Sequence, residues 1–176
     1  MRTKRIFLTG RPGVGKSTVL LRTIELLRKH GYSVGGFVTP EVRICGRRVG
    51  FVVKDLVSGN ELQFAGIGEI GRRLGKYRVN VEKFDCVALP ALRYAMENCD
   101  VIAIDEIGRM ELFSKAFERE LGRVLAMEKP LIATLHRKLR RRFEDKGVVI
   151  EVTQANRSEL PERLLKALLE DAPAGI

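Results

Sequence analysis

The pattern of hydrophobic and polar residues predicts strands that alternate with helices. Apolar, β-prone runs at Arg5–Thr9 and Ser33–Val38 are typical of short strands, and the unbroken apolar run at Asp100–Asp105 predicts a strand buried on both faces. Further strands are expected at 130–135 and 147–153, and helices at about 16–30, 81–97, 114–127, through Arg142, and at 158–170. This alternation is typical of a mostly parallel α/β sheet between layers of helices.

Two stretches depart from the alternation. Arg48–Ala65 consists of two β-prone runs joined by the turn residues Ser58, Gly59 and Asn60, which predicts an antiparallel hairpin. The glycine-spaced stretch Gly66–Gly75 predicts a mobile loop. We therefore expect a three-layer α/β fold with a mostly parallel sheet and an attached antiparallel hairpin, formed by residues 1–176 as a single domain.

Composition excludes several classes of protein. An apolar share of 45% and a charged share of 31% are typical of a soluble globular chain. No apolar run approaches the ~20 residues that span a bilayer, and "MRTKRIFLTG" lacks the long apolar segment of a secretory signal. We expect a cytoplasmic protein without a membrane partner. The three cysteines form no CxxC pair, so we interpret them as apolar fillers, and the oligomeric state stays open.

The net charge of +10 raises the question of polyanionic partners. The run "RKLRRR" (Arg137–Arg142) is the strongest indication of nucleic-acid binding, since five of its six residues are cationic. The chain has no tryptophan, aromatic residues make up 6%, and no aromatic-rich strand accompanies the run. A solvated helix face and the ion-pair-rich surface of a thermophile are the favoured explanations, and nucleic acid is the less favoured partner.

The stretch "GRPGVGKST" predicts a phosphate-binding loop, because it has the spacing GxxxxGK[ST] between a predicted strand and a predicted helix. Its glycines let backbone N–H groups turn toward phosphate oxygens, and the helix adds the positive end of its dipole. Lys16 can reach the β- and γ-phosphates, and the Ser17 hydroxyl can bind Mg²⁺. The expected contacts are Gly10, Arg11, Pro12, Gly13, Val14, Gly15, Lys16, Ser17 and Thr18.

The stretch "VIAIDEIGRMELF" supplies the acidic side of the site. Asp105 ends a buried strand, where a carboxylate can hold Mg²⁺. Glu106 can orient and deprotonate an attacking water, although it can also activate an acceptor hydroxyl or cap the following turn. Ile107 and Gly108 follow directly, and we expect them to contact the nucleotide as well.

Other strand ends carry further candidates. His136, with Thr134 as the alternative, can contact the γ-phosphate or the attacking water, unless it caps a helix. Arg43 and Arg109 both follow strand ends, where an arginine can stabilise charge on the γ-phosphate or pair with a surface carboxylate.

The loop after the last strand is the expected site of the base. Asn156 and Arg157 can stack on it or form hydrogen bonds there, which would allow binding without strict selectivity. The alternative is that these two residues form the turn that begins the last helix.

The pairing of "GRPGVGKST" with "DEIGRMELFS" resembles the small nucleoside-triphosphatase family known from thermophiles, which has a cancer-related human relative. Weaker similarities lie in the same order at 35–43, 48–53, 77–84 and 155–157, so the resemblance covers nearly the whole chain. One departure is "TQANR", where the family leads us to expect a proline and a glutamate before Asn156.

The resemblance implies a P-loop fold and hydrolysis of ATP, GTP and other nucleoside triphosphates to diphosphate and phosphate, with Mg²⁺ and little base selectivity. The residues themselves also favour hydrolysis, because a glutamate follows the Mg²⁺ aspartate and the chain offers no acceptor domain beyond the small hairpin. The alternatives are a nucleotide or nucleoside kinase and a nucleotide-switched module that binds RNA or protein.

Overall fold

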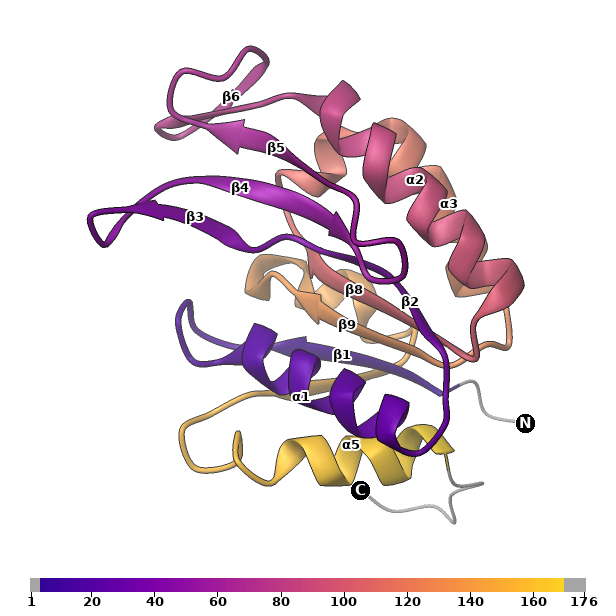
Figure 1. Cartoon of the computed structure of the whole chain (residues 1–176). Coiled ribbons are helices and arrows are strands. Elements are labelled where there is room, and N and C mark those ends of the chain that lie inside the picture. Colours follow the sequence, from indigo (N-terminus) through magenta and orange to yellow (C-terminus); the bar gives the residue numbers. More distant parts are fainter. Residues whose placement is uncertain (1–3, 170–176) are drawn as a thin grey trace.

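The computed structural model describes residues 4–169 and has a ten-stranded sheet with helices on both faces (Figure 1). Helices α1 (Lys16–Lys29) and α5 (Leu160–Leu169) pack against each other on one face. Helices α2 (Val81–Asn98) and α3 (Lys115–Ala126) cover the other. The predicted three-layer α/β architecture is therefore confirmed.

The parallel half of the sheet contains the predicted apolar strands. In spatial order these are β10 (Val148–Glu151), β1 (Arg5–Thr9), β9 (Leu131–Leu135), β8 (Val101–Ile107) and β2 (Val34–Val38). Each neighbouring pair is parallel, so the carboxyl ends of these strands meet at one edge. In such sheets that edge is where ligands bind.

The antiparallel half is larger than the predicted hairpin. Strand β4 (Arg47–Asp55) pairs with β2 and with β5 (Glu61–Gly66), which confirms the hairpin, and β3 (Glu41–Ile44) adds to β4. The prediction of a loop over 66–75 is wrong for β6 (Arg72–Leu74), because this strand pairs with β7 (Tyr77–Val79), which in turn pairs with β5.

Several boundaries differ from the sequence prediction. Strand β8 continues to Ile107, so Glu106 lies on the strand and not in the following turn. The basic helix is a 3-10 turn (Arg137–Leu139) followed by the short α4 (Arg140–Phe143). The last helix begins at Leu160, and its predicted end at 170 lies outside the described residues. Within residues 4–169, no helix is long and apolar enough to cross a membrane.

Hydrophobic side chains form one core on each side of the sheet. Phe37, Phe84 and Phe117 meet edge to face under α2 and α3, while Leu20 and Leu164 pack in the second core under α1 and α5. These cores hold the parallel strands in register and so fix the loops at their carboxyl ends.

Gly36→Ala is expected to lower the free energy of unfolding by about 2–4 kcal/mol. Gly36 has a φ of +116°, and a Cβ there would overlap the carbonyl oxygen of Ala103 on the neighbouring strand β8. Gly59→Ala is the control, since Gly59 has a φ of +75° but faces open space, so it should cost only ~1 kcal/mol of backbone strain. Urea unfolding measures both, and equal losses in the two variants would contradict the steric explanation.

Candidate active site

A cleft of about 710 Å³ lies at the carboxyl edge of the parallel strands. The phosphate loop and the start of α1 form one side of it, and Asp105 and Glu106 at the end of β8 form its floor. The loop after β2 and residues of the antiparallel strands form the opposite wall. The two sequence motifs therefore meet in one cleft, although 88 positions separate Ser17 from Asp105.

The start of α1 is prepared for an anion. Gly15 is the N-cap, with a φ of 109°, and it offers no side chain to the first N–H groups of the helix. The first turn contains no acidic residue. Unpaired N–H groups and the helix dipole therefore favour a phosphate at this point.

Lys16 projects along the loop and lines the cleft. Its Nζ donates to the carbonyl oxygens of Gly10 at 3.2 Å and Arg11 at 3.4 Å. The ammonium group is thus held over the loop, where it can exchange these neutral acceptors for charged phosphate oxygens.

Asp105 is buried, and two hydroxyl groups donate to it. Ser17 Oγ donates to Asp105 Oδ1 at 3.1 Å, and Thr134 Oγ1 donates to the same oxygen. Burial raises the pKa of Asp105, while these hydrogen bonds and the charge of Lys16 act in the opposite direction. Hydroxyl and carboxylate oxygens are the ligands that Mg²⁺ prefers, so the Ser17–Asp105 pair fits this ion.

Glu106 follows Asp105 on β8 and also lines the cleft, together with residues of the phosphate loop. Burial and, to a smaller extent, the charge of Asp105 raise the pKa of its carboxyl group to about 7, against the opposing charge of Lys16. A carboxylate with a pKa near neutrality is suited to accept a proton from water at that pH.

Glu111, at the start of the 3-10 turn η1 (Glu111–Phe113), is a cleft residue that the sequence did not indicate. It is 5% exposed, and burial raises the pKa of its carboxyl group, with the charge of Glu106 adding to the effect. Thr39 Oγ1 lies 3.5 Å from Glu111 Oε1 and donates to the Asp105 carbonyl oxygen at 2.8 Å. In the sequence, only its position five residues after Glu106 in "DEIGRME" could have indicated that Glu111 belongs to the cleft.

Among the other predicted catalytic residues, His136 and Arg109 line the cleft and Arg43 does not. His136 also caps the turn after β9, since its Nδ1 accepts from Lys138 N–H at 3.3 Å. Burial and neighbouring cations lower the pKa of His136. Arg43 instead forms an ion pair with Glu41 at 2.8 Å on β3, which is the surface-carboxylate alternative.

Arg48 and Arg137 are cleft arginines that we did not single out as site residues. Arg48 follows Arg43 by five positions on the opposite strand of the β3–β4 pair. Arg43 and Arg48 are direct partners in this pairing, but only Arg48 lines the cleft.

The predicted base contacts lie outside the cleft lining. Asn156 fixes the turn after β10, because its Oδ1 accepts from Thr153 N–H at 2.8 Å and its Nδ2 donates to Glu151 O at 2.9 Å. Arg157 donates to the carbonyl oxygen of Val14 at 3.3 Å and so lies against the outside of the phosphate loop. Asn156 therefore forms the turn before the last helix, which was its alternative, and Arg157 contacts the phosphate loop from outside the cleft lining.

The residues that follow Glu106 differ in their surroundings. Ile107 is fully buried in the core beneath α2 and α3, so the expected contact of its side chain with the nucleotide is wrong. Gly108 is close to the acidic groups, since a Cβ there would lie 2.6 Å from Glu106 Oε1 and 2.8 Å from Glu111 Oε2. Glycine at this position leaves room for the two carboxyl groups.

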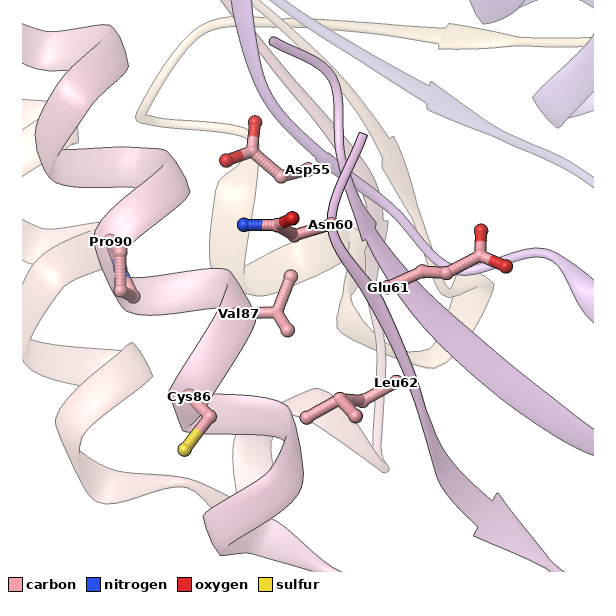
Figure 2. A pocket seen from close by; sticks show the side chains of 7 residues that line it. All are labelled: Asp55, Asn60, Glu61, Leu62, Cys86, Val87 and Pro90. Carbon is pink, nitrogen blue, oxygen red and sulfur yellow. The ribbon is translucent and has the colours of Figure 1, made fainter. Parts of the chain in front are cut away.

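A second hollow, of about 320 Å³, lies between the β4–β5 turn and α2 (Figure 2). Asn60 and Val87 extend into it, and Asp55 lies beside them. Asp55 accepts from Val57 N–H at 2.8 Å and from the Ser58 hydroxyl, so its carboxylate stabilises the β4–β5 turn. With Glu61 as a second carboxylate, this hollow is unsuited to a triphosphate.

Comparison with known proteins agrees with this geometry. The sequence model of the family described as NTPase matches residues 5–165. The chain is similar to nucleoside-triphosphatase THEP1 of Methanocaldococcus jannaschii, with 43% identity over 94% of this chain and 97% of the relative. It is also similar to nucleoside-triphosphatase THEP1 of Pyrococcus abyssi, with 44% identity over 92% of this chain and 90% of the relative.

Two solved structures have the same fold. The crystal structure of THEP1 from the hyperthermophile Aquifex aeolicus has a TM-score of 0.81 and 32% identity, and the match covers 94% of this chain and 99% of that one. The solution structure of a human cancer-related nucleoside triphosphatase has a TM-score of 0.80 and 33% identity, covering 97% of this chain and 100% of that one. The fold is thus a P-loop fold.

Proposed function

The chain belongs to the NTPase family and is a nucleoside-triphosphatase, and we propose that it hydrolyses ATP, GTP and other nucleoside 5′-triphosphates to diphosphate and phosphate with Mg²⁺ as cofactor. The observation that carries the proposal is the position of Glu106, which shares the cleft with the phosphate loop and stands beside Asp105. A carboxylate at this point can take a proton from water, the smallest possible acceptor of the phosphoryl group.

The residues of the cleft have different roles in the proposed reaction. The phosphate loop and Lys16 hold the β- and γ-phosphates, and Arg109 can stabilise charge that develops on the γ-phosphate. Glu106 orients water and accepts its proton while the bond between the γ-phosphorus and the β–γ bridging oxygen breaks. His136, which is kept neutral by its lowered pKa, offers a ring nitrogen beside the same phosphate.

Ser17 and Asp105 are the proposed Mg²⁺ ligands. In residues 4–169, no group of three or more His, Cys, Asp or Glu side chains can hold a metal, so phosphate oxygens and water would complete the coordination. When bound between these two residues and the triphosphate, the ion would offset the negative charge of the phosphates. Thr134 fixes the orientation of Asp105 through its hydrogen bond.

Broad base tolerance is proposed because few groups are placed to read the base. Asn156 is occupied by its own turn, and Arg157 presents a flat guanidinium beside the phosphate loop. A guanidinium can stack on any base, which gives affinity without selectivity.

Phosphate release from ATP, GTP, CTP and UTP, with and without Mg²⁺, tests the proposal. We expect release from all four with Mg²⁺, at rates within about tenfold of one another, and almost none with EDTA, because the ion offsets charge in the transition state. Adding nucleosides and monophosphates with labelled ATP tests the kinase alternative. Transfer of label to one of them in preference to water would contradict the proposed reaction.

RNA binding is expected to be weak at physiological ionic strength and without sequence preference. The run Arg137–Arg142 is partly neutralised, since Arg140 pairs with Glu144 at 3.1 Å and Arg142 with Glu118 at 2.6 Å. Fewer free cations release fewer counterions on binding, so the affinity should be low and its decrease with salt should be shallow. Filter binding at several salt concentrations measures this, and a tight, sequence-selective complex would contradict it.

A further inference from the structure

The far wall of the active-site cleft is apolar and aromatic. Beyond Lys16 and Glu106, the lining continues to Pro40, Phe51, Leu74, Tyr77 and Met110, contributed mainly by the antiparallel half of the sheet. An attacking water needs no such surface. Apolar walls with a few polar groups are typical of sites that bind organic ligands.

The aromatic pair on this wall is held in one arrangement. Phe51 on β4 and Tyr77 on β7 pack edge to face, with ring centroids 5.5 Å apart and an angle of 75°. The Arg48 guanidinium lies over both rings, 5.4 Å and 5.9 Å from their centroids. Arg48 Nε also donates to the Tyr77 hydroxyl at 3.0 Å, and its Nη1 pairs with Glu41 at 2.8 Å. A preformed surface of this kind would lose little side-chain entropy on binding a flat ring.

Polar groups surround the aromatic pair with both donors and acceptors. The guanidinium groups of Arg48 and Arg109 and the carboxyl groups of Glu41 and Glu111 all line the same cleft. Guanidinium groups donate hydrogen bonds and carboxylates accept them. The edge of a nucleobase offers both kinds of partner, whereas a purely apolar ring offers neither.

We propose that this wall, formed by Pro40, Arg48, Phe51, Leu74, Tyr77 and Met110 and here called the ring subsite, binds the ring of a nucleoside-class molecule while the phosphate loop holds the triphosphate. This inference rests on the proposed function, because it takes the phosphate loop to be occupied by a triphosphate.

The base of the triphosphate itself is the competing occupant of the ring subsite. The γ-phosphate is the end of the triphosphate that faces the Mg²⁺ aspartate and Glu106, and the ring subsite lies beyond these residues. In this binding mode the ribose and base would extend from the other end of the triphosphate, and Arg157, which donates to the Val14 carbonyl oxygen of the phosphate loop, is the group we propose for the base. The subsite therefore faces a second molecule.

Calorimetric titration in two stages tests the inference. The chain is first saturated with Mg²⁺ and β,γ-imido-ATP, and adenosine, guanosine, cytidine and uridine are then added one at a time. We expect at least one nucleoside to bind with a stoichiometry of one while the analogue stays bound. If the analogue failed to bind, both the proposed function and the proposed ring subsite would be contradicted. If the analogue bound but no nucleoside did, only the ring subsite would be contradicted.

Variants locate the bound nucleoside. Phe51→Ala is expected to weaken nucleoside binding about tenfold or more, the effect of losing a stacking partner worth ~1–3 kcal/mol. Arg48→Met is the second variant, because Arg48 is largely exposed and its replacement leaves the core intact. Tyr94→Ala is the control, since Tyr94 is 49% exposed on α2 and lies outside the cleft lining. If Phe51→Ala weakened binding of the analogue and no nucleoside bound the parent, the wall would hold the triphosphate's own base and the inference would be overturned.

Discussion

Glu106→Gln is expected to bind Mg²⁺–ATP at least as tightly as the parent chain and to hydrolyse it about 100-fold more slowly or worse. The variant keeps the size of the side chain and some of its hydrogen bonding, but it cannot accept the proton of the attacking water. Binding should not suffer, because Ser17, Asp105 and Lys16 supply the main contacts and one negative charge beside the γ-phosphate is removed. Single-turnover hydrolysis beside equilibrium binding measures both quantities.

Two controls make this result specific. Asp105→Asn should lose metal affinity as well as rate, because Asp105 is a proposed ligand of Mg²⁺. Glu61→Gln should change neither, since Glu61 is exposed on β5 and pairs with Lys54 at 3.4 Å, away from the cleft. A Glu106→Gln chain that hydrolyses ATP at nearly the parental rate would contradict the mechanism and restore the kinase and switch alternatives.

Lys16→Ala is expected to weaken triphosphate binding about 10- to 100-fold, which corresponds to the loss of charged hydrogen bonds, and to leave almost no turnover. The Lys16 ammonium group lies over the phosphate loop, 3.2 Å from the Gly10 carbonyl oxygen. Its loss removes a positive charge that faces the phosphates in both the bound state and the transition state.

Lys29→Ala is the matched control for Lys16→Ala, because Lys29 is an exposed lysine near the far end of the same helix. Nucleotide titration by calorimetry and a steady-state assay test both variants. Unchanged affinity together with unchanged turnover in Lys16→Ala would remove the assignment of the phosphate site.

The parallel half of the fold was predictable because its strands are continuous apolar runs. All five residues of β9 and of β2 are buried. A strand that is buried on both faces is a continuous apolar run, which can be recognised without knowing the strands that pair with it. The phosphate loop was predictable for a similar reason, since all of its residues lie in one local motif between a strand and a helix.

The antiparallel extension was harder to predict because its strands are short and largely exposed. In β3 no residue is buried, and β6 has only three residues, so neither shows the alternation that identifies a half-buried strand. These strands exist because they pair with β4 and β7, and such pairing depends on partners distant in the sequence.

Contacts across the cleft were hard to predict for the same reason, because they join residues that are distant in the sequence. Arg48 and Tyr77 are 29 positions apart and meet only through the pairing of β4, β5 and β7. Glu111 becomes buried because the turn after β8 folds back toward Thr39. Sequence patterns locate residues at the ends of strands, but the register decides which side chains face one another.

Hydrolysis of ATP in water enriched in ¹⁸O tests the central claim most directly, because that claim is that water attacks the γ-phosphorus. Mass spectrometry of the products of a single turnover measures where the label goes. We expect each released phosphate to carry one ¹⁸O atom from water and the ADP to carry none. Label in ADP, or phosphate without label, would contradict transfer of the terminal phosphoryl group to water.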